Sequence, residues 1–164
     1  MIALIIAQVI LIASLLFYNK YMGSLPASIS DSYYELNERK QGRGHLFTFF
    51  CWLIAMLIMP VWLTASREAL EFLAFLSCAG MLFAGTAAEF QSGKMDKRVH
   101  FISAFTGAGG SLIWLLLSGF WYVIVAMLIA ALFMIKKYGN KILWLEVAAI
   151  EAVILGVFIH KLLI

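Results

Sequence analysis

The chain has 164 residues, of which 64% are hydrophobic and only 13% are charged. A soluble domain of this size could not cover so much apolar surface with so few charges, so the composition excludes a soluble globular protein. The net charge of +3 is interpreted as a signal of membrane topology. We therefore expect no nucleic-acid partner.

Six apolar runs, each long enough to cross a bilayer as a helix, follow one another along the chain. They cover residues 2–18, 46–64, 70–89, 100–118, 120–136 and 142–163. The connections between them are too short to hold a separate soluble domain. We predict an all-α fold in which residues 1–164 form a single polytopic membrane domain, a bundle of six transmembrane helices.

Basic residues fall almost entirely on one side of the six runs. Arg67 and Lys161 lie on the other side. The loops after the first, third and fifth runs hold Lys20, Arg39, Lys40, Arg43, Lys94, Lys97, Arg98, Lys136, Lys137 and Lys141. By the positive-inside rule, these three loops are cytoplasmic, and the N-terminus and C-terminus are both outside.

The connection over residues 19–45 is the one long polar segment between the runs. Ser32 and Glu35 have the spacing of a helix capping box, and Gly42 has the position expected just after a helix. We predict a short helix near residues 31–41 that lies on the inner membrane surface. It is either a solvated connector or a lid over a substrate.

Small residues spaced four apart predict where the spans pack, because helices in lipid associate where their backbones approach closely. Such strips occur in the third, fourth and sixth spans, which we expect to pack tightly together. Their members are Gly80, Ala84, Ala88, Ser103, Gly107, Ser111, Ala148, Ala152 and Gly156. Consecutive glycines in the fourth span can admit a ligand close to the backbone, so Gly107, Gly110 and Ser111 are candidate binding residues.

Titratable residues gather near the cytoplasmic ends of the spans. They are His45, Glu89, Asp96, His100 and Glu146. Imidazole and carboxylate groups together could bind a metal or perform acid–base chemistry, but charged residues also gather at helix ends for solvation. Since no strong ligand spacing is present, we expect neither a metal nor a cofactor. Glu89 remains a candidate catalytic residue and Glu146 a candidate binding residue.

Glu151 lies in the middle of the last apolar run, roughly 15 Å into a hydrocarbon layer about 30 Å thick. An ionisable group at that depth is expected to be neutral and hydrogen-bonded unless it faces water, and it marks a candidate site. Gln8 of the first span lies at a comparable depth and is the expected partner. Ser77 and Ser111 are the alternatives. A role restricted to helix packing remains open beside a binding or proton-relay role.

Two segments, SISDSYY at residues 28–34 and VHFISAF at residues 99–105, resemble small uncharacterised bacterial multi-span families. The implied location is the cell (inner) membrane, with the chain as a multi-pass protein. His100 followed by Ser103 is also remotely similar to the membrane hydrolases grouped with alkaline ceramidases and adiponectin-receptor-like proteins. This resemblance implies a catalytic role for those two residues.

The hydrolase resemblance does not extend to the metal. Members of that group are expected to hold zinc with three histidines, two of them in a His-x-x-x-His pair on the last helix. The last span here carries His160 alone, and six spans replace seven. Zinc and hydrolysis therefore do not carry over.

Three function classes follow from these patterns. The leading one is a membrane-embedded binder or enzyme that acts on a lipid-like or small amphipathic molecule, in a cavity among the first, third, fourth and sixth spans. The alternatives are a small proton-coupled carrier, in which Glu151 titrates, and a non-catalytic subunit of a membrane complex. The expected partners are membrane lipids, such a ligand, and either a second copy or a complex partner.

Overall fold

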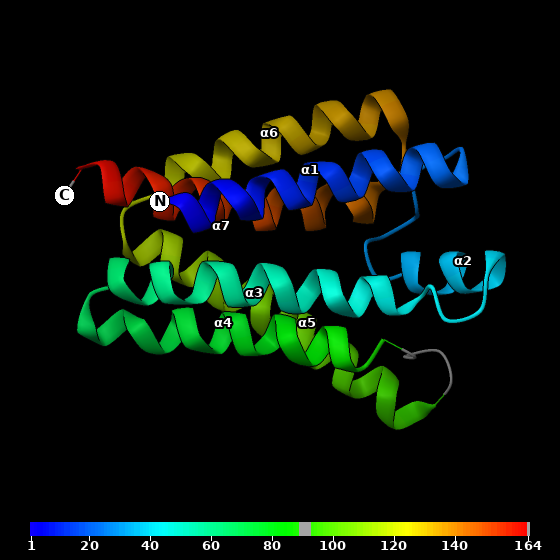
Figure 1. The fold of residues 1–164 in the computed structure, drawn as a ribbon. Helices are drawn as coiled ribbons and strands as arrows, with labels where there is room; N and C mark the ends of the chain where they lie inside the picture. Colours follow the sequence, from blue (N-terminus) through cyan, green and yellow to red (C-terminus); the bar gives the residue numbers. More distant parts are fainter. Residues whose placement is uncertain (89–92, 164) are drawn as a thin grey trace.

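In the computed structural model, which describes residues 1–88 and 93–163, the chain folds into seven α-helices (Figure 1). They are α1 (Ile2–Met22), α2 (Ser32–Arg39), α3 (His45–Ala65), α4 (Glu68–Thr86), α5 (Lys94–Leu117), α6 (Trp121–Tyr138) and α7 (Lys141–Leu163). All except α2 are long and apolar enough to span a membrane. The predicted all-α fold with six spans is confirmed.

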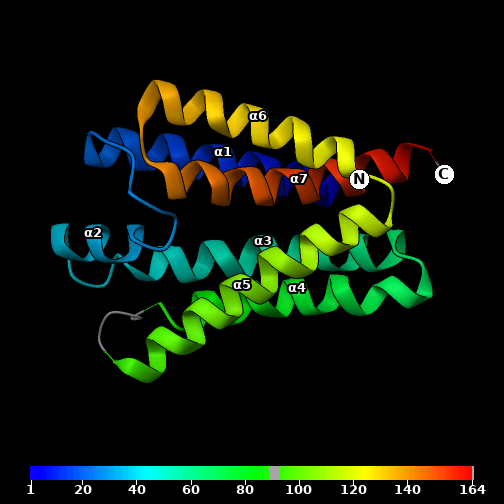
Figure 2. The ribbon, with the colours of Figure 1, turned by 180° about the vertical axis from the view of Figure 1, so that it is seen from behind.

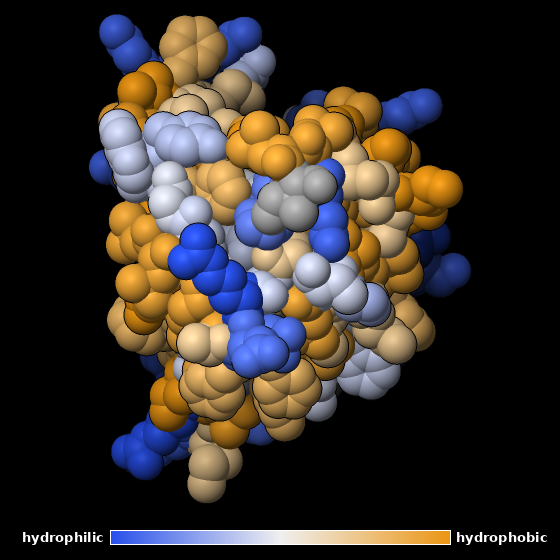
Figure 3. All heavy atoms as spheres, turned by 90° about the vertical axis from the view of Figure 1, so that its left-hand side faces the viewer, coloured by the Kyte–Doolittle hydropathy of each residue, from blue (hydrophilic) through white to orange (hydrophobic). Residues whose placement is uncertain are grey.

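The long helices form two groups, with α1, α6 and α7 on one side and α3, α4 and α5 on the other (Figure 1). Both termini lie at one end of the bundle, and α2 lies at the opposite end. Following the distribution of basic residues, we call the α2 end cytoplasmic and the other end outer. Seen from the outer end, a small group of polar side chains is surrounded by apolar ones (Figure 3).

Several helices continue beyond the apolar runs that predicted them. α1 continues to Met22, where Gly23 adopts a φ of 81° and donates its N–H to the Asn19 carbonyl. α5 begins at Lys94, six residues before the predicted start at residue 100. Hydropathy reports only the part of a helix that lies in hydrocarbon, so polar end turns are missed. α4, which corresponds to the run predicted over residues 70–89, begins at Glu68 and ends at Thr86.

The closest helix contact is between α4 and α5, as the small residues predicted. A Cβ at Gly80 would lie 2.6 Å from both the Gly107 nitrogen and the Ser103 carbonyl oxygen. A Cβ at Gly110 would lie 2.5 Å from Ser77 Oγ. Because backbone atoms of α5 lie this close to Gly80, only glycine allows the approach there.

The predicted tight packing of the sixth span against the third and fourth spans is confirmed only in part. α7 packs along α6 and meets α5 toward the outer end, where a Cβ at Gly156 would clash with the Leu115 side chain. Toward the cytoplasmic end, α5 slopes away from α7 (Figure 2). Small residues permit two helices to approach closely, but they do not set the crossing angle. The crossing angle decides over what length the helices stay close.

The predicted short helix is present as α2, but the predicted capping box is wrong. Asp31 is the N-cap residue and its side chain makes no capping bond, while Ser32 Oγ donates to the Ile29 carbonyl at 2.5 Å. The Glu35 carboxylate accepts a hydrogen bond from the Tyr18 hydroxyl of α1. A tertiary partner has therefore replaced the local one that the spacing suggested. Tyr33, which is buried, faces the bundle.

Candidate functional site

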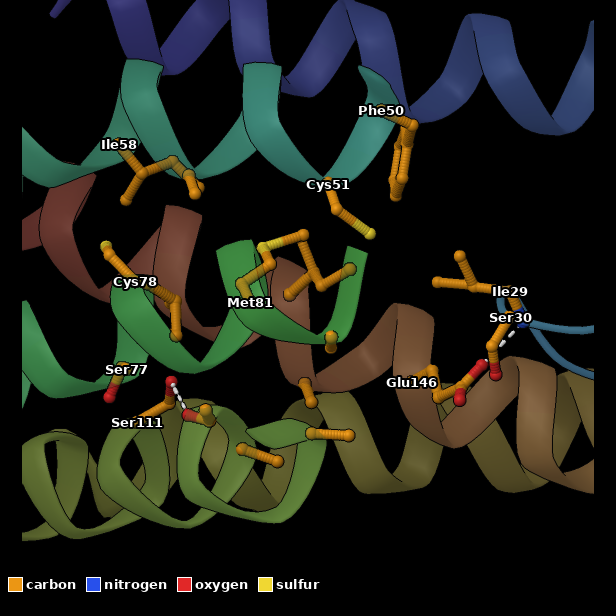
Figure 4. Close-up of a pocket in the computed structure, with 18 of the residues that line it drawn as sticks. Ile29, Ser30, Phe50, Cys51, Ile58, Ser77, Cys78, Met81, Ser111 and Glu146 are labelled. Atoms are coloured by element: carbon orange, nitrogen blue, oxygen red, sulfur yellow. Dashed lines mark hydrogen bonds between the residues drawn. The ribbon is translucent and has the colours of Figure 1, made fainter. Parts of the chain in front are cut away.

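A pocket lies between the two helix groups (Figure 4) and encloses about 860 Å³ of empty space, including its open mouth. Its walls come from α3, α4, α5 and α7, and the loop before α2 closes its cytoplasmic end. We expected the first span among the walls, but α3 takes its place. Most of the lining is apolar, including Phe50, Ala55 and Ile58 of α3 and Met81 of α4.

Aromatic packing closes the outer end of the pocket. Trp62 of α3 lines the pocket and meets Trp114 of α5 edge to face, with ring centroids 5.4 Å apart. Trp114 Nε1 donates to Ser66 Oγ at 2.8 Å. Trp62 Nε1 is buried and has no hydrogen-bond partner among the residues described. The two neighbouring indoles therefore differ in whether their N–H groups are satisfied.

We place the mouth of the pocket between α5 and α7, because lining residues of both helices are exposed or half-buried. Ala104 and Ala108 of α5 line the pocket and are exposed. On the opposite side, Ala149 and Ile150 of α7 line it and are half-buried. These residues lie within the apolar helices, so the mouth opens sideways, toward the region that lipid tails occupy.

The cytoplasmic end is closed by the loop before α2, which is fastened to the start of α7. The Ile29 N–H donates to Glu146 Oε2 at 2.6 Å. Asn140 Nδ2 donates to the Leu25 and Pro26 carbonyls at 3.0 and 2.9 Å. Ile29 and the adjacent Ser30 line the pocket beside the Glu146 carboxylate (Figure 4). Glu146 thus holds the loop in place and is the carboxylate of the pocket.

His100 also lines the pocket, and its ring is hydrogen-bonded to the end of α4. The side chain is 4% exposed, and its Nδ1 lies 3.1 Å from the Ala84 carbonyl oxygen near the end of α4. A carbonyl only accepts, so Nδ1 carries the proton. Thr48 Oγ1 donates to the next carbonyl, that of Gly85, at 2.9 Å. Side chains of α3 and α5 therefore satisfy carbonyls that the last turn of a helix leaves unpaired.

Two serines that line the pocket form hydrogen bonds within their own helices. Ser77 Oγ donates to the Leu73 carbonyl at 2.7 Å, and Ser111 Oγ donates to the Gly107 carbonyl at 2.6 Å. These bonds direct the hydroxyl protons away from the cavity. The middle of the pocket is consequently less polar than its residue types suggest.

The predicted partnership between Gln8 and Glu151 is confirmed. Gln8 Nε2 of α1 donates to Glu151 Oε1 of α7 at 2.6 Å, and both side chains are half-buried. Neither residue is among those that line the pocket. The pair joins α1 to α7 on a different face of α7 from the one that carries Glu146.

The other candidates are distributed as follows. Gly107 lines the pocket, whereas Gly110 lies behind it against Ser77. The Ser103 carbonyl lies in the α4–α5 contact, and Ser103 is not a lining residue. Glu89 falls outside the described residues.

The described members of the predicted cytoplasmic group, which exclude Glu89, do not form one cluster. His45 is exposed and lies against the Tyr33 ring, with centroids 6.1 Å apart, while Asp96 is exposed in the first turn of α5. Within residues 1–88 and 93–163, no three His, Cys, Asp or Glu side chains come together as metal ligands could. His100 and Glu146 are the two members that share the pocket.

Sequence reasoning missed Trp62 and the Ile29–Ser30 segment. Trp62 lies near the outer end of an apolar run, where tryptophans are common as interfacial anchors, and the loop matched a solvated connector. Neither carries a motif. Cys51 and Cys78 are 4% and 3% exposed and belong to the pocket wall, a place that nothing in the sequence indicates. Only the helix rotations of the folded bundle bring these residues together.

A second hollow lies between α1 and α3 beneath α2, and its empty volume is about 1210 Å³ when the open space outside it is included. Its lining includes the exposed side chains of Phe17, Leu46, Phe49 and Leu53. Its titratable side chain, Tyr18, is bonded to Glu35. This hollow is an apolar groove on the membrane-facing surface of the bundle.

No protein-family model, curated protein or solved structure matches this chain.

Proposed function

We propose that the protein is a membrane-embedded binder of an amphipathic, lipid-like molecule, which enters the pocket sideways between α5 and α7. One observation carries the proposal: exposed alanines of α5 line the pocket within the apolar segment, while Glu146 and Ser30 lie at its cytoplasmic end. A molecule with an apolar tail and a polar head matches this arrangement, because each part meets its own kind.

The position of Glu151 distinguishes this proposal from the carrier alternative. Neither hollow includes Glu151 in its lining, and its described partner is the Gln8 amide. A proton carrier needs a route by which its carboxylate meets water or substrate. Glu146 has such access in the pocket, so the proposed binding site is centred on Glu146.

Photocrosslinking tests the proposal directly. The protein is reconstituted in vesicles that contain a phospholipid with a diazirine in its acyl chain, and the labelled peptides are identified by mass spectrometry. We expect label on residues of the pocket wall, such as Cys51 and Met81, which are at most partly exposed to bulk lipid.

A matched pair of variants provides the control. Ala108→Trp fills the mouth, whereas Ala130→Trp adds the same side chain to the exposed surface of α6. The first should abolish label in the pocket wall and the second should leave it unchanged. Equal labelling of the wall in both variants, or no labelling of the wall in the unmodified protein, would refute the proposal.

A further inference from the structure

Two arginines at the cytoplasmic end of the bundle lie against one aromatic ring. Arg39 belongs to the last turn of α2, and Arg43 lies in the turn that follows. Their guanidinium carbons are 5.0 and 4.7 Å from the centre of the Tyr21 ring of α1. Two like charges are thus held around a single side chain, although they repel one another.

Hydrogen bonds fix the segment that carries these arginines. Asn37 Oδ1 accepts the Gly42 N–H at 2.8 Å, and Gly42 has a φ of 86°, which glycine adopts without strain. The closed turn brings Arg43 back beside the end of α2. The helix itself is fastened to α1 by the hydrogen bond from the Tyr18 hydroxyl to the Glu35 carboxylate. The two cations are therefore positioned by the fold.

Neither arginine pairs with a carboxylate in the part of the chain that the structure describes. Glu35, four residues before Arg39, has the spacing of a helical ion-pair partner, but its carboxylate is bonded to α1. The adjacent exposed residues are Lys20, Lys40 and Glu38, so positive charge predominates. An anion is complementary to this end, and the planar guanidinium group is well suited to phosphate oxygens.

The apolar groove between α1 and α3 begins next to the two arginines. Phe17 of α1 lines the groove, and its ring stacks on that of Tyr21, with centroids 5.6 Å apart. Leu46 of α3 also lines it and follows the second arginine by three residues. From there the walls continue to Ile10 on α1 and Leu53 on α3, about 10 Å along each helix. The groove thus leads from the cations into the hydrocarbon layer.

We infer that this groove binds one phospholipid of net negative charge, with its phosphate at Arg39 and Arg43 and an acyl chain between α1 and α3. Charge complementarity decides the occupant. A second copy of the chain in the same orientation would bring its own basic end to this depth, whereas an anionic lipid brings the missing charge together with an apolar chain. The inference concerns the second hollow and holds whether or not the pocket binds a ligand.

Native mass spectrometry of the full chain in detergent tests the inference. The protein is mixed with equal amounts of phosphatidylglycerol and phosphatidylcholine that carry the same acyl chains, and the retained lipid is identified by its mass. We expect one phosphatidylglycerol per chain, preferred about tenfold, because the arginines repel the choline cation of the other lipid. Glycerol phosphate, which has the anion without the acyl chains, should not displace it.

A matched pair of double variants assigns the preference to the arginines. Arg39→Gln with Arg43→Gln should abolish it. Lys136→Gln with Lys137→Gln removes two charges from the same end of the bundle and should leave the preference about tenfold. This control is close, because Lys137 Nζ also lies 5.0 Å from an aromatic ring centre, whereas no residue of α6 lines either hollow.

Two tryptophan variants locate the acyl chain. Ala13 of α1 is exposed and lines the groove, so Ala13→Trp should abolish retention of the lipid. Ala108→Trp instead fills the pocket between α5 and α7 and should leave retention unchanged.

Several results would overturn the inference. Equal retention of both lipids, or equal loss in the two double variants, would show that the arginines form no specific site. Displacement by glycerol phosphate would assign the cations to a soluble phosphate compound. Retention that is lost in Ala108→Trp but survives Ala13→Trp would place the lipid in the pocket. A dimer without bound lipid that dissociates in Ala13→Trp would assign the groove to a second copy.

Discussion

Two glutamates on α7, five residues apart, face different parts of the protein. They point about 140° apart around the helix axis. Glu151 meets the Gln8 side chain of α1, whereas Glu146 lines the pocket and accepts the backbone N–H of Ile29. The same residue type on the same helix thus joins two spans in one case and positions a loop beside a cavity in the other.

The difference shows that depth alone does not identify the functional carboxylate. Glu151 is nearer the bilayer centre and was the stronger candidate on that ground. Its side-chain bond to a neighbouring span provides a structural reason for a polar group at that depth. Glu146 lies nearer the surface but has both a cavity and spare acceptor positions, which makes it the better candidate for ligand binding.

The largest effect is expected at two adjacent alanines of α7, which test the contrast between the face that packs in the bundle and the face that lines the pocket. Ala148 is 9% exposed and packs with Ala131 and Leu143, whereas Ala149 lines the pocket. Ala148→Leu should lower the free energy of unfolding by about 2 kcal/mol through overpacking. Ala149→Leu should change it by less than about 0.5 kcal/mol, because its side chain enters empty space.

Unfolding can be followed with a thiol-reactive dye, because Cys51 and Cys78 are both free and buried in the folded protein. Photolabelling should give the reverse order, with the pocket signal reduced in Ala149→Leu and retained in Ala148→Leu. Equal destabilisation by the two substitutions would mean that the two faces do not differ as the structure indicates.

The loop contact gives a smaller effect that distinguishes Glu146 from Glu151. Glu146→Ala removes the acceptor of the Ile29 N–H, so that amide should exchange with solvent about tenfold faster. Hydrogen exchange followed by mass spectrometry of the loop peptide measures this. Glu146→Gln retains an acceptor oxygen and should keep most of the protection. Glu151→Leu serves as the control and should leave the exchange of this amide unchanged.

The Gln8–Glu151 pair should contribute about 1 kcal/mol to stability, as interhelical hydrogen bonds in membranes do. A double-mutant cycle with Gln8→Leu and Glu151→Leu measures this coupling from the free energies of unfolding. Glu151→Gln should fold normally, because an amide can replace the carboxyl group. A coupling near zero would show that the pair makes no net contribution, and lost photolabelling in Glu151→Leu would connect it to the pocket.

The smallest effects are expected at the two serines of the pocket wall. Ser77→Ala and Ser111→Ala each remove a hydroxyl that bonds within its own helix, so stability should change by less than about 0.5 kcal/mol. Photolabelling of the pocket wall should also remain unchanged. A marked loss of photolabelling in either variant would show that the hydroxyl turns to the ligand.

Features that depend only on depth in the membrane could be predicted from the sequence. Hydropathy located the six spans, and matching depth paired Gln8 with Glu151 across nearly the whole chain. Features that depend on rotation and crossing angle were not predictable in this way. Gly80 and Gly107 indicated a close contact, but nothing local indicated that α5 leaves α7 toward the cytoplasmic end.

The same limit applies to the candidate site. Ser32 and Glu35 matched a local capping pattern, but Glu35 is bonded to Tyr18, a partner from another helix. Glu146 and His100 were recognised as titratable residues near one membrane face, and they line one pocket. Trp62 could not be recognised, because an unsatisfied N–H becomes visible only when every neighbour has been placed.

The Gln8–Glu151 bond has a consequence for biosynthesis, because its two ends are 143 positions apart in the chain. When the ribosome has delivered the first helix to the membrane, the partner of its amide has not yet been made. Until the last helix has been translated, the Gln8 amide of the first helix lies in the bilayer without this hydrogen-bond partner. A nascent chain that stalls before residue 151 retains this exposed amide, a feature by which membrane quality control could tell unfinished copies from complete ones.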